Sequence, residues 1–198
     1  MFRPLSRRAL PVDTEALARY LIGKRVVRDL PEGRVSGRIV ETEAYITGDA
    51  AGHAYRGMTA RNRSLFLGPG YAYVYLAYGI SYMLNVSSET LGTGAGVLIR
   101  ALEPRDGIAI MQSNRGTERL RDLARGPGRL AAALRIDRSL DGLDLCQEGA
   151  LWLGCDDQAP GDIGQGTRIG ITKDADRRLR FFVVGSPFVS GPARLNTR

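Results

Sequence analysis

The stretch RVSGRIVETEAY, residues 34–45, decides much of how this chain folds, because its side chains alternate in character. Every second residue of a β-strand lies on the same face, so a period of two predicts a strand. One face of that strand carries Ile39, Glu41, Glu43 and Tyr45. The other face carries Val40, Thr42 and Ala44. The strand therefore places two carboxylates about 7 Å apart along one face.

The residues before this strand predict its partner and a covering helix. Residues 24–30 are a second β-prone run, and the turn Pro31-Glu32-Gly33 joins the two strands into a hairpin. Asp13 is a typical N-cap for a short helix that Gly23 ends. Residues 1–12 are expected to form a loose N-terminal arm, and residues 13–198 a single domain.

The residues after the strand predict the rest of the sheet. A long ordered loop is expected over residues 46–70, a length that usually indicates function. The β-prone runs 71–77 and 80–87 flank Tyr78-Gly79, which is typical of a hairpin tip. Further elements are a strand over 96–102 ended by Glu103-Pro104, helices over 105–136 broken around 125–128, strands over 151–153, 168–171 and 179–184, and a polar loop over 155–167. The predicted fold class is α+β: a single mixed domain with a curved, largely antiparallel β-sheet, flanking helices and a protruding β-hairpin.

The chain is basic and has the size of one domain. Its 198 residues include 28 Lys and Arg against 21 Asp and Glu, a formal net charge of +7. Such a surplus attracts polyanions, either nucleic acid or an acidic membrane surface. No apolar run approaches the ~20 residues that span a bilayer, and the first residues lack a secretory pattern. We therefore expect no membrane partner and a place in a bacterial cytoplasm, associated with the nucleoid.

Few residues suit a metal or a nucleotide cofactor. His53 is the single histidine, and Cys146 and Cys155 are the two cysteines, too few for a zinc site or an iron–sulfur cluster built from the usual ligands. Both thiols are expected to be free. Glycine pairs such as Gly68-Pro69-Gly70 fit neither phosphate-loop pattern. We therefore expect neither a metal nor another cofactor.

The carboxylates Glu41 and Glu43 allow more than one interpretation. Acids on one face of a half-buried sheet are either solvated or functional, and a carboxylate in a site can activate water. Their separation is also of the order found between the two carboxyls of inverting sugar hydrolases. An O-glycosidase is therefore a second hypothesis.

The tyrosine-rich run 71–82 also has two interpretations. Tyr71, Tyr73 and Tyr75 share a strand face and could form an aromatic ladder in the core. Tyr78, in contrast, lies beside Gly79 at a predicted turn, where a core aromatic is unexpected. An exposed aromatic on a hairpin of a basic protein indicates a wedge or a stacking surface for bases.

Two groups of arginines also allow two interpretations each, as DNA-binding residues or as ordinary surface residues. Arg56, Arg61 and Arg63 lie in one loop with His53, where they either contact phosphate or are simply solvated. The second group either forms one basic side or a helical surface neutralised by Glu118 and Asp122. It consists of Arg115, Arg119, Arg121, Arg125, Arg129, Arg135 and Arg138.

Taken in order, these segments resemble the alkyladenine (3-methyladenine) DNA glycosylase family. The resemblance covers about residues 14–190, nearly the whole chain, and several motifs in one order carry more weight than any single one. The matching motifs are Gly37-Arg38-Ile39-Val40-Glu41-Thr42-Glu43-Ala44-Tyr45, His53…Arg61-Asn62, Pro69-Gly70…Tyr73-Val74-Tyr75…Tyr78-Gly79…Asn85, Leu98-Ile99-Arg100-Ala101-Leu102-Glu103-Pro104, Gly126-Pro127…Leu130, Asp141…Asp144-Leu145 and Arg180-Phe181-Phe182…Gly185-Ser186-Pro187.

The resemblance implies the catalytic residues. Glu43 falls where the family keeps the general base that activates the attacking water, and Arg100 where the family helps to hold that water. Glu41 has no role in the family, which removes the main argument for an O-glycosidase. The chain departs from the family between Tyr45 and the histidine, where a segment is one residue shorter and an acidic pair is reduced to Asp49.

The resemblance also implies how the substrate is bound. Tyr45, His53 and Tyr75 fall where the family sandwiches a flipped base. Asn85 falls where the family screens the minor-groove edge of the purine. Tyr78 falls at the position of the hairpin residue that, in the family, enters the minor groove of the DNA.

The predicted function is therefore a monofunctional DNA glycosylase of base excision repair, acting as a monomer. It is expected to flip alkylated or deaminated purines from double-stranded DNA, hydrolyse the N-glycosidic bond with an activated water and leave an abasic site. Strand cleavage would need an amine that forms a Schiff base, and Lys24 and Lys173 are the only lysines. The alternative is a module that binds damaged DNA without chemistry.

Overall fold

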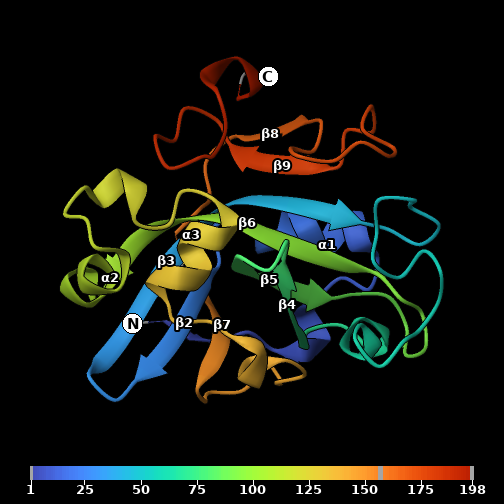
Figure 1. The fold of residues 1–198 in the computed structure, drawn as a ribbon, viewed down its shortest axis with the longest axis horizontal. Helices are drawn as coiled ribbons and strands as arrows, with labels where there is room; N and C mark the ends of the chain where they lie inside the picture. The colour runs from blue at the N-terminus through green and yellow to red at the C-terminus, as the bar shows by residue number, and fades with distance from the viewer. Residues whose placement is uncertain (1, 156–157, 197–198) are drawn as a thin grey trace.

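The computed structural model describes residues 2–155 and 158–196. Within these residues, nine antiparallel strands form one curled sheet with the order β1-β7-β2-β3-β6-β5-β4, and β9 pairs with both β3 and β8 (Figure 1). The strands are β1 (Arg3–Pro4), β2 (Arg25–Leu30), β3 (Gly33–Tyr45), β4 (Ala72–Ala77), β5 (Ser81–Ser87), β6 (Gly96–Asp106), β7 (Leu151–Cys155), β8 (Ile163–Gly166) and β9 (Arg180–Val183).

Three α-helices flank the sheet in the described residues. They are α1 (Thr14–Leu21), α2 (Ile108–Arg115) and α3 (Pro127–Ala133), and short 3-10 helices cover Arg7–Ala9, Arg63–Phe66, Leu120–Asp122, Arg138–Leu140 and Ala193–Leu195. In Figure 1, α1 lies behind the sheet and α3 in front of it, packed on β5 and β6. Helices around a curved antiparallel sheet confirm the predicted α+β class.

β3 is the central strand because it is 13 residues long and has partners on both edges. One edge pairs with β6. The other edge pairs first with β2 and then, at Glu41–Glu43, with β9. The register with β6 shifts on both sides of Glu41, which is the signature of β-bulges. Along this bulged part of β3, β9 pairs with Glu41–Glu43, and β8 in turn pairs with β9 (Figure 1).

The helix α1 covers one face of β3 and begins where the sequence predicts. The carboxylate of Asp13 caps it by accepting a 2.8 Å hydrogen bond from the backbone N–H of Ala16. The hydroxyl of Thr42 on β3 donates a 2.9 Å hydrogen bond to the carbonyl of Ala18. Leu17 and Leu21 are fully buried against the sheet and form part of the main hydrophobic core. The opposite face of β3 is therefore left for the acidic pair.

The β4–β5 hairpin ends in a turn over residues 77–80, where Ile80 N–H donates to Ala77 carbonyl. Tyr78 and Gly79 both have left-handed backbone, with φ of 51° and 70°. Two such residues give a hairpin turn the right-handed twist of its strands, which is why glycine is favoured there. Tyr78 lacks that freedom and is 91% exposed. A strained and exposed aromatic residue indicates a function for this tip.

Four expected elements differ from the structure. The described part of the expected loose arm is packed: β1 pairs with β7, and Leu5 and Leu10 are buried. β6 continues through Pro104, because β5 covers β6 only up to Leu98 and leaves an edge where the missing N–H of proline costs nothing. Residues 168–171 are not a strand but a connection held by side chains, and the expected loop over 155–167 contains β8.

The described residues can also be compared with the expectations on membrane spans, cysteines and metal sites. No helix among them is long and apolar enough to cross a membrane. Cys146 and Cys155 are both free thiols, as predicted. In residues 2–155 and 158–196, no three His, Cys, Asp or Glu side chains are grouped to hold a metal ion.

Candidate active site

A cavity of about 350 Å³ opens between the end of β3, the loop after it, the β4–β5 hairpin and residues 169–171. Its size falls in the range of small-molecule sites. It brings together five of the residues that the sequence predicts for substrate and chemistry, namely Tyr45, His53, Tyr75, Asn85 and Arg100. Tyr78 is also in its lining, so the cavity extends to the exposed hairpin tip.

One wall of the cavity is a cluster of aromatic rings. The rings of Tyr73 and Tyr75 are stacked with centroids 5.3 Å apart, and His53 meets Tyr75 edge-on at 4.3 Å. Nδ1 of His53 is hydrogen-bonded to the Tyr73 hydroxyl over 2.9 Å. His53 keeps part of its surface exposed, but desolvation of its ring and the charge of Arg61 lower its pKa, which favours the neutral ring at neutral pH. Tyr73 was not singled out as a site residue from the sequence, although it shares a strand face with Tyr75.

Tyr45 forms the wall on the β3 side and is held by a buried ion pair. The Arg168 guanidinium lies 4.7 Å over the ring of Tyr45. Arg168 forms two hydrogen bonds to the carboxylate of Asp49 and donates to the carbonyl of Ala44 over 3.1 Å. Both charged side chains are fully buried. The loop after Tyr45 therefore supplies Asp49, the acid that fixes this arginine, and the sequence pattern does not indicate this pairing.

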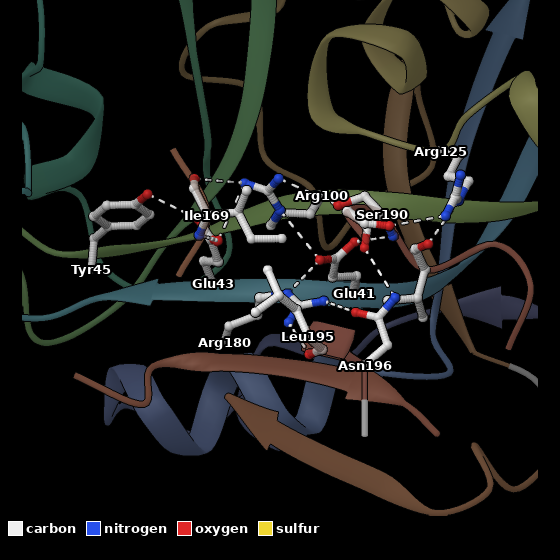
Figure 2. Close-up of polar contacts among 12 residues, drawn as sticks. Glu41, Glu43, Tyr45, Arg100, Arg125, Ile169, Arg180, Ser190, Leu195 and Asn196 are labelled. Atoms are coloured by element: carbon white, nitrogen blue, oxygen red, sulfur yellow. Dashed lines mark hydrogen bonds and ion pairs between the residues drawn. The ribbon is translucent and has the colours of Figure 1, made fainter. Parts of the chain in front are cut away.

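Glu43 is completely buried and lies beside Tyr45, Arg100 and Ile169 (Figure 2), which line the cavity although Glu43 itself does not. Its Oε2 accepts a 3.0 Å hydrogen bond from the Tyr45 hydroxyl, and its Oε1 accepts one of 2.7 Å from the backbone N–H of Ile169. Oε1 also lies 3.2 Å from Nη1 of Arg100. Burial raises the pKa of this carboxyl, and the positive charge of Arg100 only partly opposes that effect. A carboxylate of raised proton affinity is suited to take a proton from water.

Glu41 is also fully buried, so the interpretation of the acidic face as a solvated surface is wrong. Its Oε1 accepts a 2.6 Å hydrogen bond from Nε of Arg180, and its Oε2 one of 2.8 Å from the backbone N–H of Ser190. Glu41 is not part of the cavity lining. The two carboxylates thus share a strand face but have different neighbours, because Arg180 of the adjacent strand β9 and Ser190 of the C-terminal segment bind Glu41 (Figure 2).

Arg100 on β6 lies between the two carboxylates and reaches the cavity. Its Nη1 is 3.2 Å from Glu43 and its Nε is 3.4 Å from Glu41. Burial alone would lower the pKa of Arg100, but the charges of Glu43 and Glu41 outweigh burial and raise it. Arg100 therefore stays a cation inside the protein, where it can stabilise negative charge or orient a water molecule.

Asn85 and Tyr78 lie on the hairpin side. The Asn85 side chain is buried, and its Nδ2 donates a 3.2 Å hydrogen bond to the carbonyl of Tyr73. Its amide is thereby fixed at the cavity wall. Beyond it, Tyr78 and Ile80 are 91% and 82% exposed, so the tip carries two bare apolar side chains. Large exposed apolar groups on one protruding tip are typical of an interaction site.

The predicted phosphate-contacting arginines lie outside the cavity. Arg56, Arg61 and Arg63 are all exposed, and Nη2 of Arg61 donates to the carbonyl of Leu76 on the hairpin over 3.3 Å. Several helical arginines, in contrast, are already engaged: Arg129 pairs with Asp122 at 3.2 Å. The second arginine group is thus partly neutralised, as one of its two interpretations expects.

Comparison with known proteins identifies the class to which this site belongs. The sequence profile of the methylpurine-DNA glycosylase (MPG) family matches residues 8–187, and the chain belongs to that family. A relative from Mesorhizobium japonicum is 78% identical over 192 residues, which are 97% of this chain and 92% of the relative. Others from Paraburkholderia phytofirmans and Methanoculleus marisnigri are 53% and 46% identical, over 97% and 90% of this chain and 90% and 94% of theirs. All three carry the provisional name 3-methyladenine DNA glycosylase.

Proposed function

We propose that this protein is a monofunctional glycosylase that flips alkylated or deaminated purines out of double-stranded DNA and hydrolyses their N-glycosidic bond. The products are a free base and an intact abasic site. Membership of the methylpurine-DNA glycosylase family supports a DNA glycosylase role. The substrates, the flipping of the base and the attack by water are what we propose in addition. We place its action at the bacterial nucleoid, as a monomer without a metal or other cofactor.

The observation that carries this proposal is that Arg100, which lines an aromatic cavity, pairs with the buried Glu43 directly behind it. Loss of a purine leaves positive charge on the sugar, and a nearby carboxylate stabilises that charge and deprotonates water. Among the residues that the structure describes, the Tyr45 hydroxyl is the one hydrogen-bond partner of Oε2 of Glu43. Release of that one hydrogen bond frees the oxygen to accept the proton of a water that Arg100 orients.

The cavity walls supply the recognition that such a reaction needs. A flipped base would lie between the ring of Tyr45 and the rings of His53 and Tyr75, which stacking favours. The neutral ring of His53 avoids repulsion from a base that alkylation has made cationic. The fixed amide of Asn85 would face the minor-groove edge of the purine. The structure already places these four side chains around one cavity.

The outer surface supports binding to duplex DNA. A base leaves the stack at a cost of a few kcal/mol, and a side chain inserted into the gap offsets it. Two exposed aromatic residues, Tyr55 and Tyr78, belong to the cavity lining, and Tyr78, at the hairpin tip, is the more exposed of the two. The exposed Arg56, Arg61 and Arg63, with the net charge of +7, provide attraction for the phosphate backbone.

Two other functions are weaker. An O-glycosidase would use both carboxylates on its sugar, but the hydrogen bonds of Glu41 go to Arg180 and Ser190, whereas those of Glu43 go to Tyr45 and Ile169 in the cavity lining. A module that only binds damaged DNA would not need a buried carboxylate of raised pKa beside an arginine. Neither alternative explains why Glu43 and Arg100 meet at the cavity.

A release assay on a panel of lesions tests the proposal. The protein is incubated with duplexes that each contain one methylated purine, hypoxanthine or ethenoadenine, and free base and alkali-labile sites are measured. We expect release of a purine from at least one duplex, with no strand cleavage before alkali. Tight binding to a lesion without release from any duplex would favour the binding module, and release of sugar from a polysaccharide would favour the O-glycosidase.

A further inference from the structure

Glu41 has no part in the chemistry proposed above, yet it contacts the arginine that does. We propose that Glu41 is a positioning residue for Arg100, and that Arg180 and the C-terminal residues 190–196 fix Glu41 for that task. The inference rests on the proposed role of Arg100 in catalysis. It gives the second carboxylate of the acidic pair, which does not line the cavity, a function in the reaction.

The first observation is that the hydrogen bonds and ion pairs of Arg100 with the described residues are all long. Nε lies 3.4 Å from Glu41, Nη1 3.2 Å from Glu43 and 3.4 Å from the carbonyl of Ile169, and Nη2 3.3 Å from the Ser190 hydroxyl. Charge-assisted bonds are normally about 2.7–2.9 Å long. The place of the Arg100 guanidinium is therefore set by the balance of two carboxylates and not by one tight bond.

The second observation concerns the Nε group of Arg100. It is buried and has no hydrogen-bond partner among the described residues, so its long ion pair with Glu41 is the polar contact it keeps. A buried polar group without a partner is costly. If the charge of Glu41 is removed, Nε loses that contact, and Glu43 becomes the only carboxylate that attracts Arg100. The guanidinium would then shift toward Glu43.

The third observation is that Glu41, unlike Arg100, is held tightly. Arg180 and the Ser190 N–H donate to its two oxygens over 2.6 and 2.8 Å. Arg180 is in turn hydrogen-bonded to the carbonyl of Leu195 over 2.8 Å and to the side chain of Asn196 (Figure 2). Because the Glu41 carboxylate is held rigidly and the Arg100 guanidinium is held loosely, the position of Glu41 can determine the position of Arg100.

The C-terminal segment is itself anchored from the other side. Nε of Arg125, just before α3, donates a 2.8 Å hydrogen bond to the carbonyl of Val189, and its Nη2 one of 3.1 Å to Gly191. These two residues flank Ser190, whose N–H holds Glu41 and whose hydroxyl accepts from Arg100 (Figure 2). The segment thus connects Arg125, just before α3, to the pair of Glu43 and Arg100.

The electrostatics support a functional role as well. The four groups Glu41, Glu43, Arg100 and Arg180 carry two negative and two positive charges in one buried cluster. The negative charge of Glu41 is one cause of the raised pKa of Glu43, and the charge of Arg100 opposes it. Removal of the Glu41 charge acts on both: it removes a repulsion and strengthens the pairing of Arg100 with Glu43. Both effects lower the pKa of Glu43.

The test uses Glu41→Gln, with Glu103→Gln as a matched control that breaks an arginine pair, to Arg105, elsewhere in the sheet. In Glu41→Gln we expect single-turnover excision to slow on the order of tenfold, because displacement of a positioned group costs rate. Affinity for a lesion duplex should change little. The acid limb of the pH–rate profile should move to lower pH. Glu103→Gln should match the wild type in all three measurements.

A second readout does not depend on activity. The side-chain ¹H–¹⁵N signal of Arg100 Nε is assigned by its loss in Arg100→Lys, and that of Arg168 serves as an internal reference. Glu41→Gln should shift or broaden the Arg100 signal and leave the Arg168 signal in place. If the wild type releases no base but the Arg100 signal moves, the proposed function fails and the positioning of Arg100 stands.

An unchanged Arg100 signal together with an unchanged rate and acid limb in folded Glu41→Gln would overturn the inference. Loss of folding is anticipated, because Arg180 would be a buried cation without its carboxylate. In that case Glu41→Gln/Arg180→Met is compared with Arg180→Met, since neither variant buries an unpaired arginine. The same shift of the Arg100 signal and acid limb is expected between these two variants, and its absence rejects the inference.

Discussion

The hydroxyl of Tyr45 donates a 3.0 Å hydrogen bond to the carboxylate of Glu43, two residues earlier on the same strand. The residue proposed to stack on the flipped base is thus bonded to the residue proposed to activate water. This bond favours the ionised form of Glu43 and is one of the causes that hold its pKa down against burial. Recognition of the base and proton transfer are therefore coupled through a single hydroxyl.

Tyr45→Phe tests this coupling because it keeps the ring and removes the bond. Without the hydroxyl the pKa of Glu43 should rise further, so the base form is lost at a higher pH as the solution is acidified. The acid limb of the excision profile should therefore move to higher pH, opposite to the shift expected for Glu41→Gln. Affinity for a lesion duplex should be kept, because the ring remains. An acid limb that stays in place would contradict the coupling.

Glu43→Gln removes the proposed general base at nearly constant shape. Excision should fall by ~10²–10⁴, the usual worth of general-base assistance, while binding of damaged DNA is retained. Single-turnover release of base and fluorescence anisotropy measure the two. The loss should exceed that of Glu41→Gln, and equal damage from both variants would revive a mechanism with two carboxylates.

Glu43→Gln also has a pH-dependent effect on stability. Because the pKa of Glu43 is raised in the folded protein, its protonated form favours folding, and this stability is lost as the pH rises through the folded pKa. Gln remains neutral throughout. The melting temperature of the variant relative to the wild type should therefore increase as the pH rises above about 4.3, the ordinary pKa of a glutamate. A difference that decreases over this range would mean that Glu43 is stabilised as an anion.

Tyr78 is expected to matter for the flipped state more than for the chemistry. Tyr78→Ala should reduce excision of a paired lesion more than of the same lesion in a bulge, where the base is already out of the stack. Tyr78→Gly is the matched variant, since it also lacks the ring but suits the φ of 51°. It should be more stable than Tyr78→Ala by about 1 kcal/mol, with the same excision defect. Equal losses on both DNA substrates would mark Tyr78 as structural.

Binding to undamaged duplex should weaken steeply with salt, because arginine–phosphate contacts release counterions. The exposed Arg56 and Arg63 are the test pair. Their joint replacement by Gln should reduce the slope of log affinity against log salt by about two, one for each phosphate contact. Arg34→Gln, whose guanidinium is already held by Asp29 at 2.6 Å, is the control and should leave the slope unchanged. A weak salt dependence of the wild type would argue against a DNA-facing basic surface.

Borohydride trapping tests the absence of an amine nucleophile. The ammonium of Lys24 lies 4.8 Å over the ring of Tyr20, and Lys24 is not part of the cavity lining. Lys173 is exposed and follows Ile171, a residue of the cavity lining, by two positions. Lys173 is therefore the lysine for which the absence of a trapped adduct is the stronger test. No covalent protein–DNA product is expected, and strand cleavage should follow only alkali. A trapped adduct at Lys173 or at the N-terminal amine, which lies outside the described residues, would overturn the water mechanism.

The sequence alone determined the features that depend on neighbouring residues. The alternation in residues 34–45 predicted β3, and the polar side chain of Asp13 predicted the start of α1. The pair Tyr78-Gly79 predicted the hairpin tip. Each of these depends on backbone geometry within a few residues, which local composition encodes.

The tertiary structure alone decided what covers the acidic face of β3. The period of two placed Glu41 and Glu43 on one face of the strand. It did not determine whether that face is exposed to solvent or buried by other parts of the chain. Ile169 reaches Glu43 from 126 positions away, and Arg180 reaches Glu41 from 139. No local pattern specifies such partners, because they depend on how the strand pairing brings distant segments together. Burial behind those segments, and not the spacing along the strand, raises the pKa of Glu43 and separates the two carboxylates into different environments.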